Sequence, residues 1–159
     1  MADNRARHGG GFIIASIFFS IVLMLIPLPD FLRFFRPEFV ALTLIYWTMA
    51  LPRHVGVGYA WLVGLFMDLV MGGALGLMAF SYAFIVYLVL TFHLQLRQYP
   101  IWQQAISIFS LVLLLQMLLL LTSPRVADWN FWLPPFVSMM LWPAIYTILR
   151  SVRRTFHVS

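Results

Sequence analysis

The chain has no cysteine and very few charged residues. Without cysteine, disulfides and thiolate chemistry are excluded. Charged residues make up 9% of the 159 residues, whereas a soluble domain carries roughly 25%. Hydrophobic residues make up 63% of the chain. A chain this apolar has too few polar residues to cover the surface of a soluble domain. This composition indicates that it folds in a lipid bilayer.

The residue patterns of common active sites are also missing. The four histidines lack metal-ligand spacing, and there is neither a G-x-S-x-G motif nor a phosphate-binding loop. The histidines are His8, His54, His93 and His157. We therefore predict that the protein is not an enzyme and binds no metal or cofactor.

Six apolar runs are expected to cross the membrane as helices. A spanning helix needs about 20 apolar residues, within a range of about 17–25, and these runs are too long and too unalternating for barrel strands. The expected spans are 12–28, 38–51, 55–71, 75–92, 102–121 and 131–149. The second is short enough to be a tilted or re-entrant segment. Together they predict an all-α integral membrane protein with one domain over residues 1–159.

The arginines are distributed unequally between the two sides that six spans define. One side would carry Arg5, Arg7, Arg53, Arg97, Arg150, Arg153 and Arg154, and the other side Arg33, Arg36 and Arg125. Because cytoplasmic loops are enriched in arginine and lysine, this split predicts that both termini are cytoplasmic. The same bias explains the net charge of +5 without a nucleic-acid partner.

A row of small residues runs through the third expected span. Every fourth position from 56 is small except for one aspartate: Gly56, Ala60, Gly64, Asp68, Gly72 and Gly76. Such a row lies along one helix face, and small residues let another backbone approach closely. It predicts internal packing of the bundle or, alternatively, a docking face for a partner's helix. Gly72 and Gly73 are expected to end the helix, because glycine tolerates the left-handed C-cap.

Asp68 is the one charge in the segment 64–76, about one turn before the outer end of the third span. A charge at the bilayer centre costs roughly 2.5–3.5 kcal/mol, so this carboxyl group should face protein or water. Three interpretations follow: a polar contact that organises the bundle, a side chain that snorkels to the interface, and a proton- or substrate-handling group. The expected partners are Arg36 and the N-terminus of the fourth span, where the helix dipole is positive.

Three segments resemble the bacterial rod-shape-determining MreD family. They are FRPEFVALTLIYWTMALPRHVGVGYAW (35–61), GLFMDLVMGGALG (64–76) and LWPAIYTILRSVRR (141–154), and the resemblance covers approximately 12–155. The matched positions are Arg36, Pro37 and Trp47 in the second-helix motif, and Gly64, Asp68, Gly72 and Gly76 in a glycine–aspartate motif. With Glu38, Gly56 and Ala60, these are the candidate structural or partner-binding residues.

The resemblance implies a non-enzymatic scaffold of the cell-elongation machinery in the bacterial inner membrane. Its expected partners are the membrane helix of MreC and, through it, MreB and the elongation penicillin-binding protein and RodA, with a homo-oligomer left open. The family is similar in fold to the six-helix substrate-binding components of energy-coupling-factor transporters. Two alternatives stand beside the scaffold: a transporter-type subunit that binds a small molecule, and an intramembrane enzyme that uses Asp68 with Glu38 as a second acid.

Overall fold

The computed structural model describes residues 3–33, 35–121 and 129–156. Every regular element in those residues is a helix, as the sequence predicts. The elements are α1 (Asp3–Leu25), α2 (Asp30–Arg33), α3 (Phe39–Ala50), α4 (Val57–Met71), α5 (Leu77–Gln98), α6 (Ile101–Leu120), the 3-10 helix η1 (Trp129–Trp132) and α7 (Leu133–Thr155).

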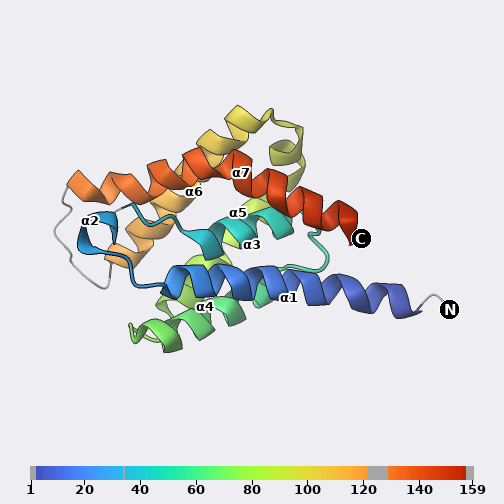
Figure 1. Ribbon diagram of the computed structural model, residues 1–159, viewed down its shortest axis with the longest axis horizontal. Coiled ribbons are helices and arrows are strands. Elements are labelled where there is room, and N and C mark those ends of the chain that lie inside the picture. The colour runs from blue at the N-terminus through green and yellow to red at the C-terminus, as the bar shows by residue number, and fades with distance from the viewer. Residues whose placement is uncertain (1–2, 34, 122–128, 157–159) are drawn as a thin grey trace.

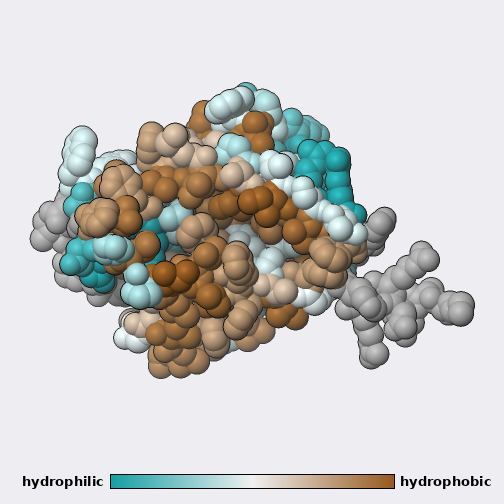
Figure 2. Space-filling model, in the orientation of Figure 1, coloured by the Kyte–Doolittle hydropathy of each residue, from teal (hydrophilic) through white to brown (hydrophobic). Residues whose placement is uncertain are grey.

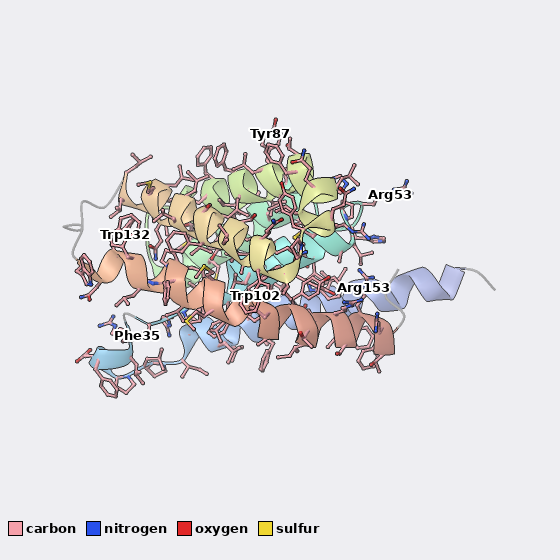
Figure 3. The ribbon with its side chains drawn as sticks, turned by 90° about the horizontal axis from the view of Figure 1, so that it is seen from above. Phe35, Arg53, Tyr87, Trp102, Trp132 and Arg153 are labelled. Carbon is pink, nitrogen blue, oxygen red and sulfur yellow. The ribbon has the colours of Figure 1, made fainter. Side chains whose placement is uncertain are left out.

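The longer helices run back and forth along one axis. α1 begins and α7 ends at the same end of the bundle (Figure 1). Figure 3 places Arg53 and Arg153 toward that end, and Phe35 and Trp132 at the opposite one. We call these the arginine end and the loop end. Short connections make α4 and α5, and likewise α5 and α6, antiparallel neighbours in space, whereas α3 packs against α1, α5 and α7.

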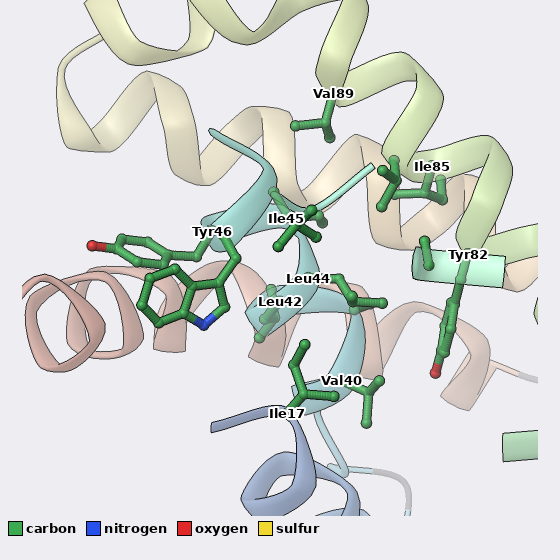
Figure 4. Packing of buried hydrophobic residues seen from close by; sticks show 14 of the residues in the cluster. Ile17, Val40, Leu42, Leu44, Ile45, Tyr46, Tyr82, Ile85 and Val89 are labelled. Atoms are coloured by element: carbon green, nitrogen blue, oxygen red, sulfur yellow. The ribbon is translucent and has the colours of Figure 1, made fainter. Parts of the chain in front are cut away.

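α3 forms the centre of the bundle. Residues 40–49 of this helix are all buried, and α3 contacts α1, α5 and α7. Figure 4 shows its Leu42, Leu44 and Ile45 beside Ile17 of α1 and Ile85 of α5. A helix that is hydrophobic all round belongs inside a protein. With 12 residues, at 1.5 Å each, α3 is about 18 Å long, shorter than a hydrocarbon core of about 30 Å.

Each expected span coincides with a helix, but the helices fall into two length classes. Those long and apolar enough to cross a membrane are Leu77–Gln98, Ile101–Leu120 and Trp129–Thr155. The shorter apolar helices are Gly10–Leu25, Phe39–Ala50 and Val57–Met71.

The helix ends differ from the expected ones where local chemistry decides them. α1 ends at Leu25 rather than at residue 28, because Pro27 disfavours helical backbone in the residue before it. α5 continues to Gln98, six residues beyond the expected end, because Gln95, Leu96 and Arg97 are good helix formers.

The surface of the bundle is broadly apolar. Figure 2 shows hydrophobic residues across the middle of the visible face and hydrophilic ones at its left edge and upper right. Large side chains are exposed on several helices, with Phe18 62%, Leu62 60%, Leu94 64% and Met140 67% accessible. Exposed apolar area this extensive marks a surface that contacts lipid or protein rather than water.

Candidate functional site: Gly64, Asp68 and the start of helix α5

The carboxylate of Asp68 caps the start of α5 from the neighbouring helix α4. Its Oδ2 accepts hydrogen bonds from the backbone N–H of Gly76 at 2.9 Å and of Ala79 at 3.2 Å. Its Oδ1 accepts from the N–H of Met78 at 2.9 Å. The first N–H groups of a helix have no partner within the helix, and the helix dipole makes that end positive. Asp68 therefore supplies both the acceptors and the negative charge that the start of α5 lacks.

Of the two partners expected for Asp68, the structure shows the helix N-terminus. The Arg36 alternative is wrong, because Nη2 of Arg36 donates instead to the backbone carbonyl of Ile26, just after α1 ends. There it satisfies a carbonyl group that the helix leaves free. The snorkelling interpretation is wrong as well, since Asp68 is only 2% exposed and its carboxylate points into protein.

Gly64 brings the backbones of α4 and α5 into direct contact. A Cβ atom at this position would lie 2.5 Å from Cα of Ala79 and 2.5 Å from the carbonyl oxygen of Met78. Gly64 precedes Asp68 by four residues and so shares its helix face. The glycine lets α4 lie close enough to α5 for the carboxylate to reach the amides. Ala60, one turn earlier on this face, is fully buried.

The remaining glycines of the row shape the turns at the ends of α4. Gly72 (φ +66°) ends α4 and donates its N–H to the carbonyl of Asp68 at 3.1 Å. Gly76 (φ +94°) precedes α5. Both have left-handed backbones, which favour glycine, so the expected helix end at Gly72 is confirmed. Gly56 precedes α4 with extended backbone, and an added Cβ would meet nothing within 4 Å there. The row is therefore not one continuous packing face.

The candidates of the second-helix motif tie α3 to its neighbours. Pro37 is buried, and Glu38 precedes α3 and donates its backbone N–H to Oγ of Ser138 on α7 at 3.2 Å. Trp47 is fully buried, and its Nε1 donates to Oγ of Ser16 on α1 at 2.8 Å. The motif residues thus connect α3 to α7 at the loop end and to α1 farther along the helix.

Comparison with known proteins identifies the chain. The family model described as "rod shape-determining protein MreD" matches residues 6–152. The chain belongs to the MreD family. A curated relative, "Rod shape-determining protein MreD" of Haemophilus influenzae, is 31% identical over 148 residues, which cover 90% of this chain and 91% of the relative. No solved structure matches. Membership in the MreD family supports a role in determining rod shape, and with the apolar helices it supports a membrane protein.

Gln104 is a residue of this MreD-family chain that the sequence interpretation missed. Its Nε2 donates to the carbonyls of Leu96 at 2.9 Å and Tyr99 at 3.2 Å, and its Oε1 accepts from Nε1 of Trp142 at 3.3 Å. These bonds join α6 to the end of α5 and to α7. Gln104 is 5% exposed. The available signal was an amide side chain near the start of an apolar run, a position where buried polar groups tend to pair across helices.

Proposed function

We propose that this MreD-family chain is a non-enzymatic scaffold in the bacterial inner membrane that binds MreC and supports lateral peptidoglycan synthesis. The observation that carries the proposal is the hydrogen bonding of the Asp68 carboxylate. Both of its carboxylate oxygens accept hydrogen bonds from backbone amides, so the group holds helices together and is not presented to a substrate. Family membership supports the role in rod shape.

The rest of the described chain also favours a scaffold over an enzyme. Within the described residues, no group of three or more His, Cys, Asp or Glu side chains could hold a metal ion. Catalysis requires a nucleophile, base or metal in mutual reach, whereas both carboxylate oxygens of Asp68 are already bound by backbone amides.

We propose that six helices cross the membrane, with both termini in the cytoplasm. The apolar parts of α1, α3 and α4 are short. Non-helical backbone is tolerated at membrane depth where protein surrounds it, and residues 40–49 of α3 are all buried. The arginine end would face the cytoplasm, because it carries Arg53 and Arg153 and arginine is enriched in cytoplasmic loops. The arrangement would be that of the substrate-binding components of energy-coupling-factor transporters.

The topology is testable with single cysteines, because the native chain has none. Cysteine at Arg53 should react with an impermeant maleimide only after the membrane is opened. Cysteine at Asp30, which lies at the other end of the bundle, should react in intact spheroplasts. The reverse pattern would overturn the orientation, and labelling of both in spheroplasts would overturn the six crossings.

The proposed partner is the membrane helix of MreC, through which the chain would reach MreB and the elongation penicillin-binding protein and RodA. Depletion of the chain should turn rods into spheres, and a tagged chain should co-purify MreC. A Gly64→Ala variant should fail to restore rods, since it pushes α4 from α5, whereas Gly58→Ala on the same helix should restore them. Rods that persist after depletion, or a tagged chain that never retains MreC, would overturn the proposal.

A further inference from the structure

Three arginines lie on one face of α7 near its end, together with a tyrosine. Arg150, Arg153 and Arg154 are separated by three and four residues, the intervals that place side chains on the same helix face. Tyr146 is one turn before Arg150, and the guanidinium carbon of Arg150 lies 6.0 Å from the centre of its ring. The end of α7 therefore presents three positive charges in one direction.

This face of α7 is turned toward α3. The rings of Tyr146 and of Tyr46, on α3, meet edge to face with their centres 5.5 Å apart. All three arginines lie near enough to the hydroxyl group of Tyr46 for their charges to act on it, and the charge of Arg153 acts most strongly. Figure 4 shows this hydroxyl group pointing away from Leu44 and Ile45. The three guanidinium groups and the hydroxyl group thus gather at one place at the arginine end.

No acidic side chain among the described residues forms an ion pair with the arginines of α7. The ion pair that the described part of the chain contains joins Arg33 to Asp30 at the loop end, with nitrogen and oxygen 3.7 Å apart. Glu38 and Asp68 lie at the start of α3 and near the end of α4, toward the same loop end. The ends of α3 and α7 each carry about half a negative charge, which offsets only part of three guanidinium charges. The excess positive charge suits an anion.

The depth of these arginines in a bilayer favours a lipid phosphate as that anion. α7 belongs to a helical segment long and apolar enough to cross a membrane, and it begins at Leu133, directly after Trp132, a residue type enriched at the membrane interface. Arg150 is about 26 Å along the helix from Leu133, and Arg154 about 32 Å. Because a hydrocarbon core is about 30 Å thick, these side chains emerge at the level of the phosphates. An acidic protein segment would have to displace those phosphates to reach them.

We propose that Arg150, Arg153 and Arg154, with the hydroxyl group of Tyr46, bind the phosphate of an anionic phospholipid in the leaflet at the arginine end. Guanidinium groups bind phosphate oxygens through paired N–H donors, and the tyrosine hydroxyl group supplies one more donor. An anionic headgroup is preferred, because the ammonium group of phosphatidylethanolamine would meet the arginines with like charge. The inference goes beyond the scaffold proposal and rests on α7 crossing a membrane.

The test measures lipid binding to the delipidated full chain in detergent by native mass spectrometry. Phosphatidylglycerol should bind more tightly than phosphatidylethanolamine, and a higher ionic strength should weaken its binding. Arg153→Gln should weaken phosphatidylglycerol binding about tenfold, because it removes a charge-assisted hydrogen bond. Arg97→Gln is the matched control, since it removes the same charge from the end of another helix, α5, and it should leave the binding unchanged.

Equal losses in Arg153→Gln and Arg97→Gln would overturn the proposal, because any arginine at this end would then attract the lipid equally. Glycerol phosphate separates the two sources of phosphate: if it binds as tightly as phosphatidylglycerol, the site takes a soluble phosphate and the lipid assignment is overturned. An Arg153→Gln variant that keeps its lipid binding but loses MreC in co-purification would also overturn it, because the arginines would then hold an acidic protein segment.

If Arg153→Gln does not fold, Tyr46→Phe decides. This variant keeps the buried ring and removes only the hydroxyl group, which forms no hydrogen bond within the described residues, so the bundle should remain intact. Severalfold weaker binding of phosphatidylglycerol supports the proposal, and unchanged binding overturns it. Since the purified chain lacks MreC, failure of the lipid-binding measurements leaves the scaffold proposal untouched.

Discussion

Replacing Gly64 by alanine should weaken the packing of α4 against α5. The new Cβ would lie 2.5 Å from backbone atoms of Met78 and Ala79, and backbone cannot move aside as a flexible side chain can. α4 and α5 must separate by about 1 Å to regain ordinary van der Waals contact. The 2.9 Å and 3.2 Å bonds from Met78 and Ala79 to Asp68 would lengthen with them.

The expected cost combines two terms. Overpacking costs typically about 1–3 kcal/mol, and a hydrogen bond to a charged group contributes about 1.5–3 kcal/mol. Since separation weakens these bonds without removing all of them, we expect Gly64→Ala to lose roughly 3–5 kcal/mol of unfolding free energy.

Gly58 provides the matched control, because it lies in the same helix and a Cβ there would meet nothing within 4 Å. Gly58→Ala should be neutral or gain up to about 1 kcal/mol from helix propensity. In thermal unfolding of the detergent-purified protein, the two variants should therefore differ by about 10 °C or more in Tm. A Gly64→Ala variant as stable as Gly58→Ala would refute the close contact of α4 and α5.

Substitutions at three further residues test the polar contacts. Asp68→Ala should cost about 3 kcal/mol or more, because it leaves amides at the start of α5 without acceptors. Asp68→Asn, which keeps one acceptor oxygen, should fall between it and the wild type in thermal unfolding. Gln104→Leu should lower Tm while Gln103→Leu, at an exposed neighbour, should not; equal Tm values would count against the α5–α6–α7 contact. Trp47→Phe should cost more than about 1 kcal/mol, since Ser16 loses the indole donor and the smaller ring leaves a cavity at a fully buried position; a chemical-denaturation midpoint equal to that of the wild type would contradict this.

The helices could be located from the sequence, because apolar runs and the prolines after them are local signals. The complete burial of α3 inside the bundle could not be predicted from the sequence. Its twelve residues are apolar in the way of any short span, and only the positions of α1, α5 and α7 show that residues 40–49 are buried all round. The end of α5 could not be predicted either. The residues after 92 are polar enough to suggest a loop, although they favour helical backbone.

Of the two partners expected for Asp68, the sequence could not show which one it binds. Antiparallel helices with a short connection place the start of one beside the end of the other, so the helix N-terminus was a foreseeable partner. Arg36 was an equally reasonable one by charge, but it binds the carbonyl of Ile26, and a backbone carbonyl has no sequence signature. The spacing of the glycines hid their different roles, because the interval of four continues from Gly64 in the helix to Gly72 and Gly76 in the turn.

The polar contacts together explain how a short buried helix can hold a membrane bundle. Lipid tails are as apolar as leucine, so burial alone does not drive helices together, and packing with hydrogen bonds must do so. α3 makes such bonds to two neighbours. Trp47 bonds to Ser16 of α1, and Thr43 bonds to Ser20 of α1 at 2.6 Å. The backbone N–H of Glu38, just before α3, donates to α7. Asp68 of α4 accepts hydrogen bonds from the start of α5, and Gln104 of α6 bonds to the end of α5 and to α7. Each of these helices is therefore hydrogen-bonded to a neighbour, and α3 connects α1 to them.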